Sequence, residues 1–263
     1  MNSNIAYSLG KSVPTPTFGY LGGKAVSEKF KQLEEVIEKE DVQVVFQPLV
    51  DLRTKELFAY EALARTTSPH FSGPPEMFDV AVQMGRAGEL GRLVRKLAVE
   101  KCKEFPLFLN VHPDEFGDGW IMQSDDPIFF HHHQIYLEIT ESVPLKYNDV
   151  CHGILKEIRS GGVKLAVDDL GSGYSNLKYI SDLRPDIVKL DRGLIAGLAR
   201  GTRMYRLVTA IVNLCVDMGA KVVAEGVENA QELFAAVDSG AHYGQGFVLA
   251  RPASEPPTPT WPT

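Results

Sequence analysis

The 263-residue sequence has little cysteine, no long apolar run and no excess of basic residues. Its cysteines, Cys102, Cys151 and Cys215, are an odd number at wide spacings, which fits neither a zinc site nor a disulfide framework and predicts reduced thiols in a cytoplasmic protein. No apolar stretch is long enough to span a bilayer, and the N-terminus lacks a signal-peptide pattern. The net charge of -7 argues against DNA or RNA as a partner, because phosphate backbones demand a basic surface.

The composition is that of a globular α/β protein. Hydrophobic residues make up 44% of the chain, enough for the core of one large domain, although two small domains would also fit the length. Residues 1–26 and 253–263 are predicted to be a flexible leader and a proline-rich tail around a domain at 27–252. Residues 27–40 are predicted to form a lead-in helix capped by Ser27, with an apolar face made of Phe30, Leu33, Val36 and Ile37.

Short apolar runs alternate with helix-patterned stretches from Val42 onward. Most of the runs are hydrophobic almost throughout, as in strands covered on both faces. The strand candidates are VQVVFQPLV, LFAYEAL, FPLFLNV, QIYLEIT, VKLAV, DIVKL, AKVVAE and GQGFVLA, and the helix candidates include DVCHGILKEIRSG, LIAGLARGTRMYRLVTAIVNLCVDMG and NAQELFAAVDSG. This alternation over roughly 210 residues predicts a (β/α) barrel, with an open doubly wound sheet as the alternative.

Most of the predicted strands end in a group that can bind metal or phosphate. One such group alone is more often a helix cap or a solvated terminus, and the adjacent aspartates of KLAVDDLGSGYSNL have the same simple explanation. A common position at strand ends instead predicts one shared site, made of Glu61, Asn110, Glu138, Asp168, Asp169, Lys189 and Glu225.

The chemistry of these side chains indicates hard cations. Oxygen ligands without cysteine or paired histidine favour Mg²⁺ or Mn²⁺ over zinc. Adjacent aspartates suit two ions, because one carboxylate can span both while its neighbour holds the second. Without cations the cluster would repel itself, and some of its carboxyls should have raised pKa values.

The run His131–His133 is predicted to be a surface loop, and DLGSG a mobile active-site loop rather than a P-loop.

Six segments resemble, in order and spacing, the EAL-domain cyclic di-GMP phosphodiesterases of bacterial second-messenger signalling. They are FQPLVDLRTKELFAYEALAR, LFLNV, YLEITES, LAVDDLGSGYSNLKYISDLRPDIVKLDR, VVAEGVEN and GQGFVLARP, covering about Val42 to Pro252. The naming triplet Glu61-Ala62-Leu63 alone would be no evidence, whereas the ordered set is specific. The resemblance implies a TIM-like (β/α)8 barrel with one antiparallel strand, and hydrolysis of cyclic di-GMP to linear pGpG with two Mg²⁺ or Mn²⁺ ions.

The resemblance also implies a role for each matching residue. The first ion would be held by Glu61, Asn110, Glu138 and Asp168. Asp168 would bridge to a second ion held by Asp169 with Glu225 and Glu228, although a water-mediated or general-base role for the last two is equally compatible. Lys189 would orient the attacking water, and Glu141 would brace the loop after Asp169. The implied substrate contacts are Gln47, Leu63, Arg65, Asp191 and Gln245, with capping, or support of the residues that hold the ions, as the alternatives for Asp191.

The sequence departs from the family pattern at three positions. Leu170 and Ser172 stand where the family usually has phenylalanine and threonine, which puts the rate and its control in doubt more than the site itself. His112 stands where many relatives have a small residue, and its role is open. The resemblance further implies a homodimer through the face near DDLGSG. A catalytically weak or inactive cyclic di-GMP receptor, acting through a protein partner, is the alternative function, but it is disfavoured because Glu61 and both aspartates are present.

Overall fold

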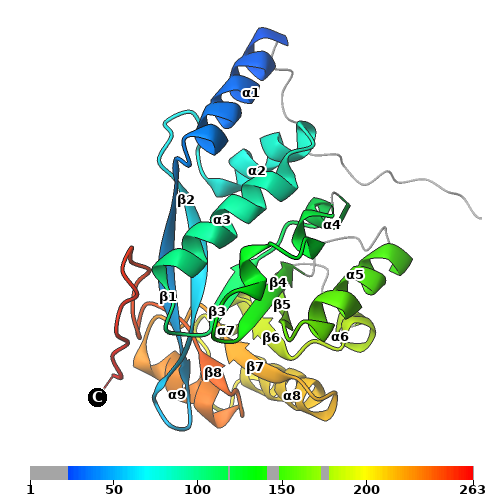
Figure 1. Ribbon diagram of the computed structural model, residues 1–263. Coiled ribbons are helices and arrows are strands. Elements are labelled where there is room, and N and C mark those ends of the chain that lie inside the picture. Colours follow the sequence, from blue (N-terminus) through cyan, green and yellow to red (C-terminus); the bar gives the residue numbers. More distant parts are fainter. Residues whose placement is uncertain (1–22, 118, 141–147, 173–177, 263) are drawn as a thin grey trace, which may run out of the picture.

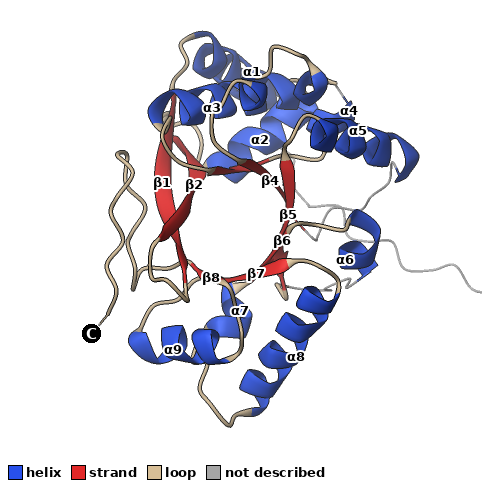
Figure 2. Cartoon of the chain, turned by 60° about the horizontal axis from the view of Figure 1, so that its bottom comes forward, coloured by secondary structure: helices blue, strands red, loops and turns tan. Residues whose placement is uncertain are grey.

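The computed structural model describes residues 23–117, 119–140, 148–172 and 178–262. Eight strands close into a barrel in sequence order, with helices around the outside (Figure 2). The strands are β1 (Val42–Asp51), β2 (Leu57–Thr66), β3 (Leu107–Asn110), β4 (Ile135–Thr140), β5 (Lys164–Leu170), β6 (Ile187–Leu190), β7 (Lys221–Ala224) and β8 (Tyr243–Gly244). β1 pairs antiparallel with β2 and β8, and all other neighbours are parallel. The predicted TIM-like barrel with one antiparallel strand is confirmed, which excludes the open sheet.

The helices cover the barrel in two groups (Figure 1). The first contains α1 (Gly23–Glu38), α2 (Pro74–Gln83), α3 (Ala87–Lys101), α4 (Asp114–Gly117) and α5 (Asn148–Ser160), with the short 3-10 turns η1 (Trp120–Met122) and η2 (Pro127–Phe129). The second contains α6 (Lys178–Leu183), α7 (Arg192–Ile195), α8 (Arg203–Asp217) and α9 (Ala230–Asp238). No helix within the described ranges is both long enough and apolar enough to cross a membrane. The buried thiols of Cys102 and Cys215 are free, whereas the side chain of Cys151 is outside the described part.

The lead-in helix and the long helix candidate before β7 differ from the prediction. α1 begins at Gly23 and ends at Glu38, so Ser27 lies inside the helix and does not cap it. The stretch predicted as one helix over residues 194–219 is two helices, α7 and α8. Gly197 and Gly201 lie between them with φ of 69° and 81°, a left-handed conformation that ends a helix.

The eighth strand is shorter than its apolar run predicts. β8 ends at Gly244, and the chain then turns, with the Leu249 amide donating to the Gly246 carbonyl at 3.0 Å. Gly246 packs so closely on Val227 that a Cβ there would lie 2.1 Å from the Val227 carbonyl oxygen. The segment after β8 therefore packs on the loop after β7 instead of extending the sheet.

The C-terminal segment is packed, not loose. Ala253 forms an isolated bridge with Phe46 of β1, and the Tyr60 hydroxyl donates to the Pro257 carbonyl at 3.0 Å. Trp261 packs against the core between the second group of helices and the barrel. The proline content of the C-terminal segment excludes regular structure, but it does not exclude an ordered extended segment held by side chains.

Candidate active site

The polar residues form one layer inside the barrel, next to a layer of apolar side chains. Side chains alternate along a strand, so residues two apart both point into the barrel. The apolar layer is Leu49, Ala59, Phe108, Tyr136, Ala166, Ile187, Val223 and Tyr243. Two residues away from each, on the same strand or directly after it, lies one member of the polar layer: Gln47, Glu61, Asn110, Glu138, Asp168, Lys189, Glu225 and Gln245. The aromatic rings plug one half of the barrel, and the polar groups gather in the other.

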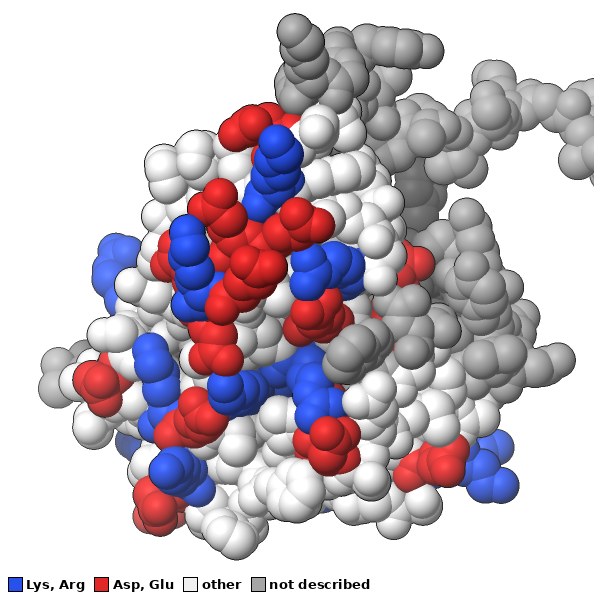
Figure 3. Space-filling model, turned by 45° about the horizontal axis from the view of Figure 1, so that its top comes forward, with Lys and Arg blue, Asp and Glu red and all other residues white. Residues whose placement is uncertain are grey.

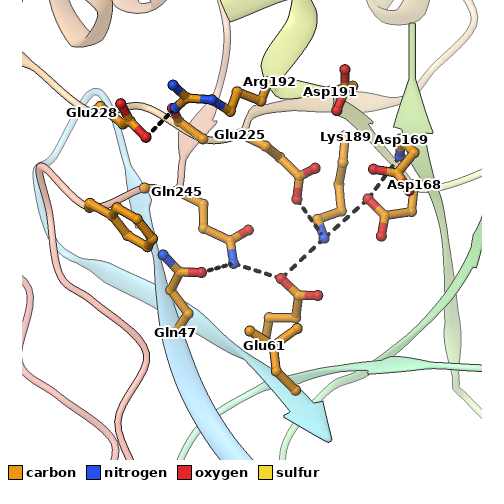
Figure 4. Close-up of a pocket in the computed structure, with 14 residues that line it drawn as sticks. Gln47, Glu61, Asp168, Asp169, Lys189, Asp191, Arg192, Glu225, Glu228 and Gln245 are labelled. Carbon is orange, nitrogen blue, oxygen red and sulfur yellow. Dashed lines mark hydrogen bonds and ion pairs between the residues drawn. The ribbon is translucent and has the colours of Figure 1, made fainter. Parts of the chain in front are cut away.

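Lys189 is the centre of the polar layer and is 1% exposed. Its Nζ lies 2.5 Å from Glu138 Oε1 and 2.6 Å from Glu225 Oε1, and 3.3 Å from both Glu61 Oε2 and Asp168 Oδ1. Figure 4 shows Glu61, Asp168 and Glu225 converging on this ammonium from different strands. A single buried cation therefore faces four carboxylates, which leaves the layer with excess negative charge.

The excess charge shifts the pKa values as an acid-rich site should. Burial, then repulsion from Glu61, raises the pKa of Glu138 well above its ordinary value. Burial, then repulsion from Asp168, raises the pKa of Asp169 to about 6. Burial alone would lower the pKa of Lys189, but the surrounding carboxylates raise it well above its ordinary value. Without further positive charge the carboxylates of this layer repel one another, as the sequence predicts.

The carboxylates form two groups that share Asp168. Glu61, Glu138 and Asp168 each offer an oxygen within 4.8 Å of the others, and so do Asp168, Asp169 and Glu225. Within the described part of the chain, the contact of buried Glu138 Oε1 is its ion pair with Lys189, and this oxygen has no other hydrogen-bond partner. This donor set, hard oxygen in two groups with one shared member, fits a pair of Mg²⁺ or Mn²⁺ ions.

Asparagine completes the first carboxylate group. Asn110, at the end of β3, donates from Nδ2 to Glu61 Oε1 at 3.2 Å and to Glu138 Oε2 at 3.0 Å. It thereby joins two carboxylates that would otherwise repel each other. Its amide also offers an oxygen, the ligand atom that a hard cation prefers.

A backbone turn brings the adjacent aspartates together. Side chains of consecutive strand residues point to opposite faces, so Asp169 would leave the barrel if β5 continued regularly. Instead the pairing of β5 with β6 shifts between Val167 and Leu170, and Asp169 has φ of 59°. The Asp169 amide also donates to Asp168 Oδ1 at 2.9 Å. The irregularity returns the Asp169 carboxylate to the neighbourhood of Asp168.

Two glutamines hold Glu61 from the other side. Gln245 Nε2 donates to Glu61 Oε2 at 2.6 Å and to Gln47 Oε1 at 3.3 Å, and Gln47 Nε2 donates to the Ala250 carbonyl at 3.3 Å. Gln47 and Glu61 are direct partners across the β1–β2 ladder. Gln245 Oε1 is buried without a partner among the described residues, so it can accept from a bound molecule.

Two cavities open over the polar layer and share Leu63. The acidic cavity, about 380 Å³, is lined by Gln47, Glu61, Leu63, Asp168, Asp169, Lys189, Asp191, Glu225, Glu228 and Gln245 among the predicted residues. The neighbouring cavity, about 410 Å³, contains Arg65, Asn110 and His112. Arg65 is thus the one predicted substrate contact that lies outside the acidic cavity, and its guanidinium donates to the Ala64 carbonyl at 2.7 Å.

Two predicted acidic residues among those the structure describes, Glu228 and Asp191, stand apart from the two carboxylate groups. Glu228 forms an ion pair with Arg192 at 2.5 Å on the cavity rim and joins neither group. Asp191 lines the cavity, and its carboxylate also accepts from the Gly193 amide as the N-cap of α7, which agrees with the alternative role. Glu141 lies outside the described residues, and its predicted role stays a prediction.

Comparison with known proteins places the chain in a family. The EAL domain family matches residues 31–252. The chain belongs to the EAL domain family. It is 30% identical over 227 residues to the cyclic di-GMP phosphodiesterase PA2567 of Pseudomonas aeruginosa, covering 81% of this chain and 39% of that protein. The chain spans less than half the length of the first curated relatives it matches.

Solved EAL structures have the same barrel. The cyclic di-GMP complex of the MucR phosphodiesterase of Pseudomonas aeruginosa superposes with a TM-score of 0.70 at 28% identity, covering 81% of this chain and 96% of that one. The Klebsiella pneumoniae BlrP1 complex with manganese and cyclic di-GMP gives 0.65 at 29% identity, covering 82% and 57%. The resemblance inferred from the sequence is confirmed at the level of family and fold.

This EAL domain has cavity residues that the sequence did not single out. Arg192 and Phe247 line the acidic cavity, and Arg251 lies 4.2 Å over the Phe247 ring. Phe247 follows Gln245 by two residues, the same spacing that relates the other interior residues, and Arg192 directly follows Asp191. The two-residue spacing from Gln245 was therefore an available signal for Phe247, whereas alternation does not point to Arg192.

Proposed function

We propose that this EAL domain hydrolyses cyclic di-GMP to linear pGpG with the help of two Mg²⁺ or Mn²⁺ ions. The observation that carries the proposal is the pair of carboxylate groups sharing Asp168, next to a buried lysine at the floor of the acidic cavity. The named activity of PA2567 and the bound ligands of MucR and BlrP1 support it. The two ions would be held by Glu61, Asn110, Glu138, Asp168, Asp169 and Glu225.

The reaction requires water to add to phosphorus and one P–O3′ bond to break. The product then has a 5′-phosphate and a 3′-hydroxyl, and the departing 3′ oxygen takes a proton. Bound divalent cations supply Lewis acidity and lower the pKa of water, so that hydroxide is available near neutral pH.

The chain's own groups hold the substrate and the nucleophile. Lys189 and Glu225, 2.6 Å apart, can together orient a water, since one donates and the other accepts. Gln245 and Gln47 fix Glu61 and leave Gln245 Oε1 for the substrate. Arg65 lies beyond Leu63, where a dinucleotide spanning both cavities would present its second phosphate.

The alternative is a cyclic di-GMP receptor that signals through a partner without turnover. The complete acidic set disfavours it, because a receptor needs the dinucleotide's shape but not a shared carboxylate between two metal groups. A cytoplasmic location and the absence of a DNA or RNA partner stay predictions. On the face that Figure 3 shows, acidic and basic side chains are interspersed without a continuous basic surface.

The deciding experiment incubates the purified protein with cyclic di-GMP and Mg²⁺ or Mn²⁺ and follows pGpG by chromatography. We expect turnover that a chelator and Glu61→Ala abolish, and that Asp168→Asn lowers by at least about 10²-fold, because an amide lacks the charge needed between two cations. Glu56→Gln, on the exposed β1–β2 hairpin, is the matched control and should leave the rate unchanged.

A second readout does not depend on turnover. Ligands that bind only the folded state stabilise it, by about 2.7 kcal/mol at a hundredfold excess over Kd. Mn²⁺ should therefore raise the Tm of the wild type and of Glu56→Gln, but not that of Asp168→Asn. Metal-independent binding of cyclic di-GMP without pGpG would favour the receptor and contradict the proposed hydrolysis.

We also propose that the domain forms a homodimer, and the support comes from α8. Apolar side chains recur on its outer side at alternating spacings of three and four residues, as in a coiled-coil seam. Four are more than a third exposed and Ile211 is half-buried; the seam is Met204, Leu207, Ile211, Leu214 and Met218. α8 lies beside α6, which follows the DDLGSG loop, so the helix that carries the seam is close to the loop named in the dimer prediction (Figure 2).

A further inference from the structure

The barrel has one side without a crossover helix, and the C-terminal segment covers it. β1 and β2 are joined by a hairpin, so no helix lies between them in sequence. Residues 251–262, here called the C-terminal strap, run along the outside of β1 in both ribbon views (Figures 1 and 2). The strap therefore takes a place that helices occupy beside the parallel strands.

The strap is fastened at several points. Phe46 and Ala253 exchange both backbone hydrogen bonds, at 2.7 and 3.1 Å. The Tyr60 hydroxyl donates to the Pro257 carbonyl at 3.0 Å. At the far end, Trp261 packs on the apolar core and the Lys55 ammonium lies 5.1 Å from the Trp261 ring centroid. Backbone pairing and an aromatic anchor thus fix both ends of the segment.

The residues of β1 and β2 that bind the strap directly precede two residues of the polar layer. Phe46 precedes Gln47, and Tyr60 precedes Glu61. Ala253 pairs with the Phe46 backbone at the edge of β1, and the Pro257 carbonyl accepts from the Tyr60 side chain. Since side chains alternate along a strand, both contacts fix the backbone next to Gln47 and Glu61, whose side chains point inside. The inner side is tied to the same segment, because Gln47 Nε2 donates to the carbonyl of Ala250, three residues before Ala253.

We propose that the C-terminal strap positions Glu61: it holds the edge of β1 and the outer side of β2 so that the chain of hydrogen bonds from Ala250 through Gln47 and Gln245 reaches the Glu61 carboxylate. Trp261 and Tyr60 are then positioning residues, distant from the reacting atoms. Misplacement of a catalytic group by about 1 Å can cost about 10²-fold in rate, so a small shift of β1 is enough to matter. The proposal rests on the proposed function for its Mn²⁺ and kinetic readouts, whereas hydrogen exchange is independent of it.

The test compares Trp261→Ala and Tyr60→Phe with the exposed strap control Glu255→Gln in the full chain. Tyr60→Phe removes only the hydroxyl that reaches Pro257 and retains the ring. We expect Trp261→Ala to speed amide hydrogen exchange over residues 44–50, to weaken Mn²⁺ binding and to lower kcat about tenfold while KM changes less than about twofold. Tyr60→Phe should shift all three in the same direction by less.

The outcomes separate the strap from the proposed function. Loss of thermal stability in both variants, with exchange, Mn²⁺ affinity and kcat equal to those of Glu255→Gln, would show that the strap only stabilises the fold and would overturn the proposal. If Trp261→Ala does not fold, Tyr60→Phe decides in the same way. If the wild type makes no pGpG, the proposed function fails, and hydrogen exchange still decides whether the strap positions the site.

Discussion

At the residue scale, the buried cations in the described part of the chain, Lys189 and Arg95, have opposite surroundings. Lys189 is outnumbered by carboxylates at the cavity. Arg95 of α3 is enclosed, with Nη1 2.5 Å from Glu115 Oε2 and Nη2 2.8 Å from Asp126 Oδ2. Glu115 also accepts from the His112 amide at 2.8 Å. The Arg95 cluster therefore ties α3 to the loop that follows Asn110, and its role is structural.

Arg95→Met tests this role, because it keeps much of the side-chain volume while leaving Glu115 and Asp126 buried without a cation. Removing one partner of a buried ion pair costs about 3–5 kcal/mol, so the free energy of unfolding should fall by that amount. Arg92→Met, one turn earlier on α3, is the matched control. Its ion pair with Asp125 is largely exposed on the aspartate side, and the loss should be below about 1 kcal/mol. Equal losses in urea denaturation would contradict the assignment.

At the element scale, α1 is attached to the barrel through α2. The Lys29 ammonium bonds to the Glu76 carboxylate and to the His70 carbonyl, and Glu76 Oε2 accepts from the Ser72 amide at 2.7 Å. The hydrogen bond from Lys29, then those from Ser72, lower the pKa of Glu76 to about 2. The lead-in helix is therefore docked by an acid-sensitive contact as well as by the burial of Leu33 and Val36.

The pH dependence of stability should expose this contact. A carboxyl whose pKa is lower in the folded state stabilises the fold above its unfolded pKa, near 4.5, and this stabilisation is lost as the pH falls toward 2. The difference in free energy of unfolding between wild type and Glu76→Gln should thus be constant above about pH 5 and shrink below it. Glu40→Gln, which removes a half-exposed partner of Lys96, is the control. A pH-independent difference for Glu76→Gln would rule out the docking role.

At the scale of the whole molecule, the charges of α8 favour an antiparallel pair of copies. Arg203 and Arg206 lie at its N-terminal end and Asp217 at its C-terminal end. A two-fold axis across the helix would bring the arginines of one copy near the aspartate of the other, whereas a parallel pair would bring like charges together. The same axis would pair the seam on α8 with itself.

The dimer has a direct test. Leu207→Glu combined with Leu214→Glu puts four carboxylates into the seam of a dimer, so the mass measured by light scattering should fall from dimer to monomer. Val216→Glu is the matched control, because Val216 is 45% exposed on the same helix but off the seam, and it should remain dimeric. A wild type that is monomeric at every concentration, or a dimer that survives both seam substitutions, would contradict the interface.

The sequence by itself determined which residues could form the site and in which fold. The alternation of side chains along each strand carries this information. Tyr136 and Glu138 are two residues apart on one strand, and so are Ala166 and Asp168. A polar residue two positions after an interior apolar residue is therefore predicted to lie at the mouth of the barrel. The residue types, oxygen donors without cysteine, predict the kind of cation. Family resemblance added the roles, which local pattern alone does not assign.

Only the tertiary structure decided how these residues meet. Glu61 and Gln245 are 184 positions apart, and closure of β8 onto β1 is what brings them to 2.6 Å. The same closure separates Arg65 from the acidic cavity and ends β8 at the close contact of Gly246 with Val227. It also turns the proline-rich tail into a strap, because the uncovered side of β1 exists only once the barrel has formed. Local sequence sets what each residue can do, whereas contacts between distant segments depend on the closed backbone.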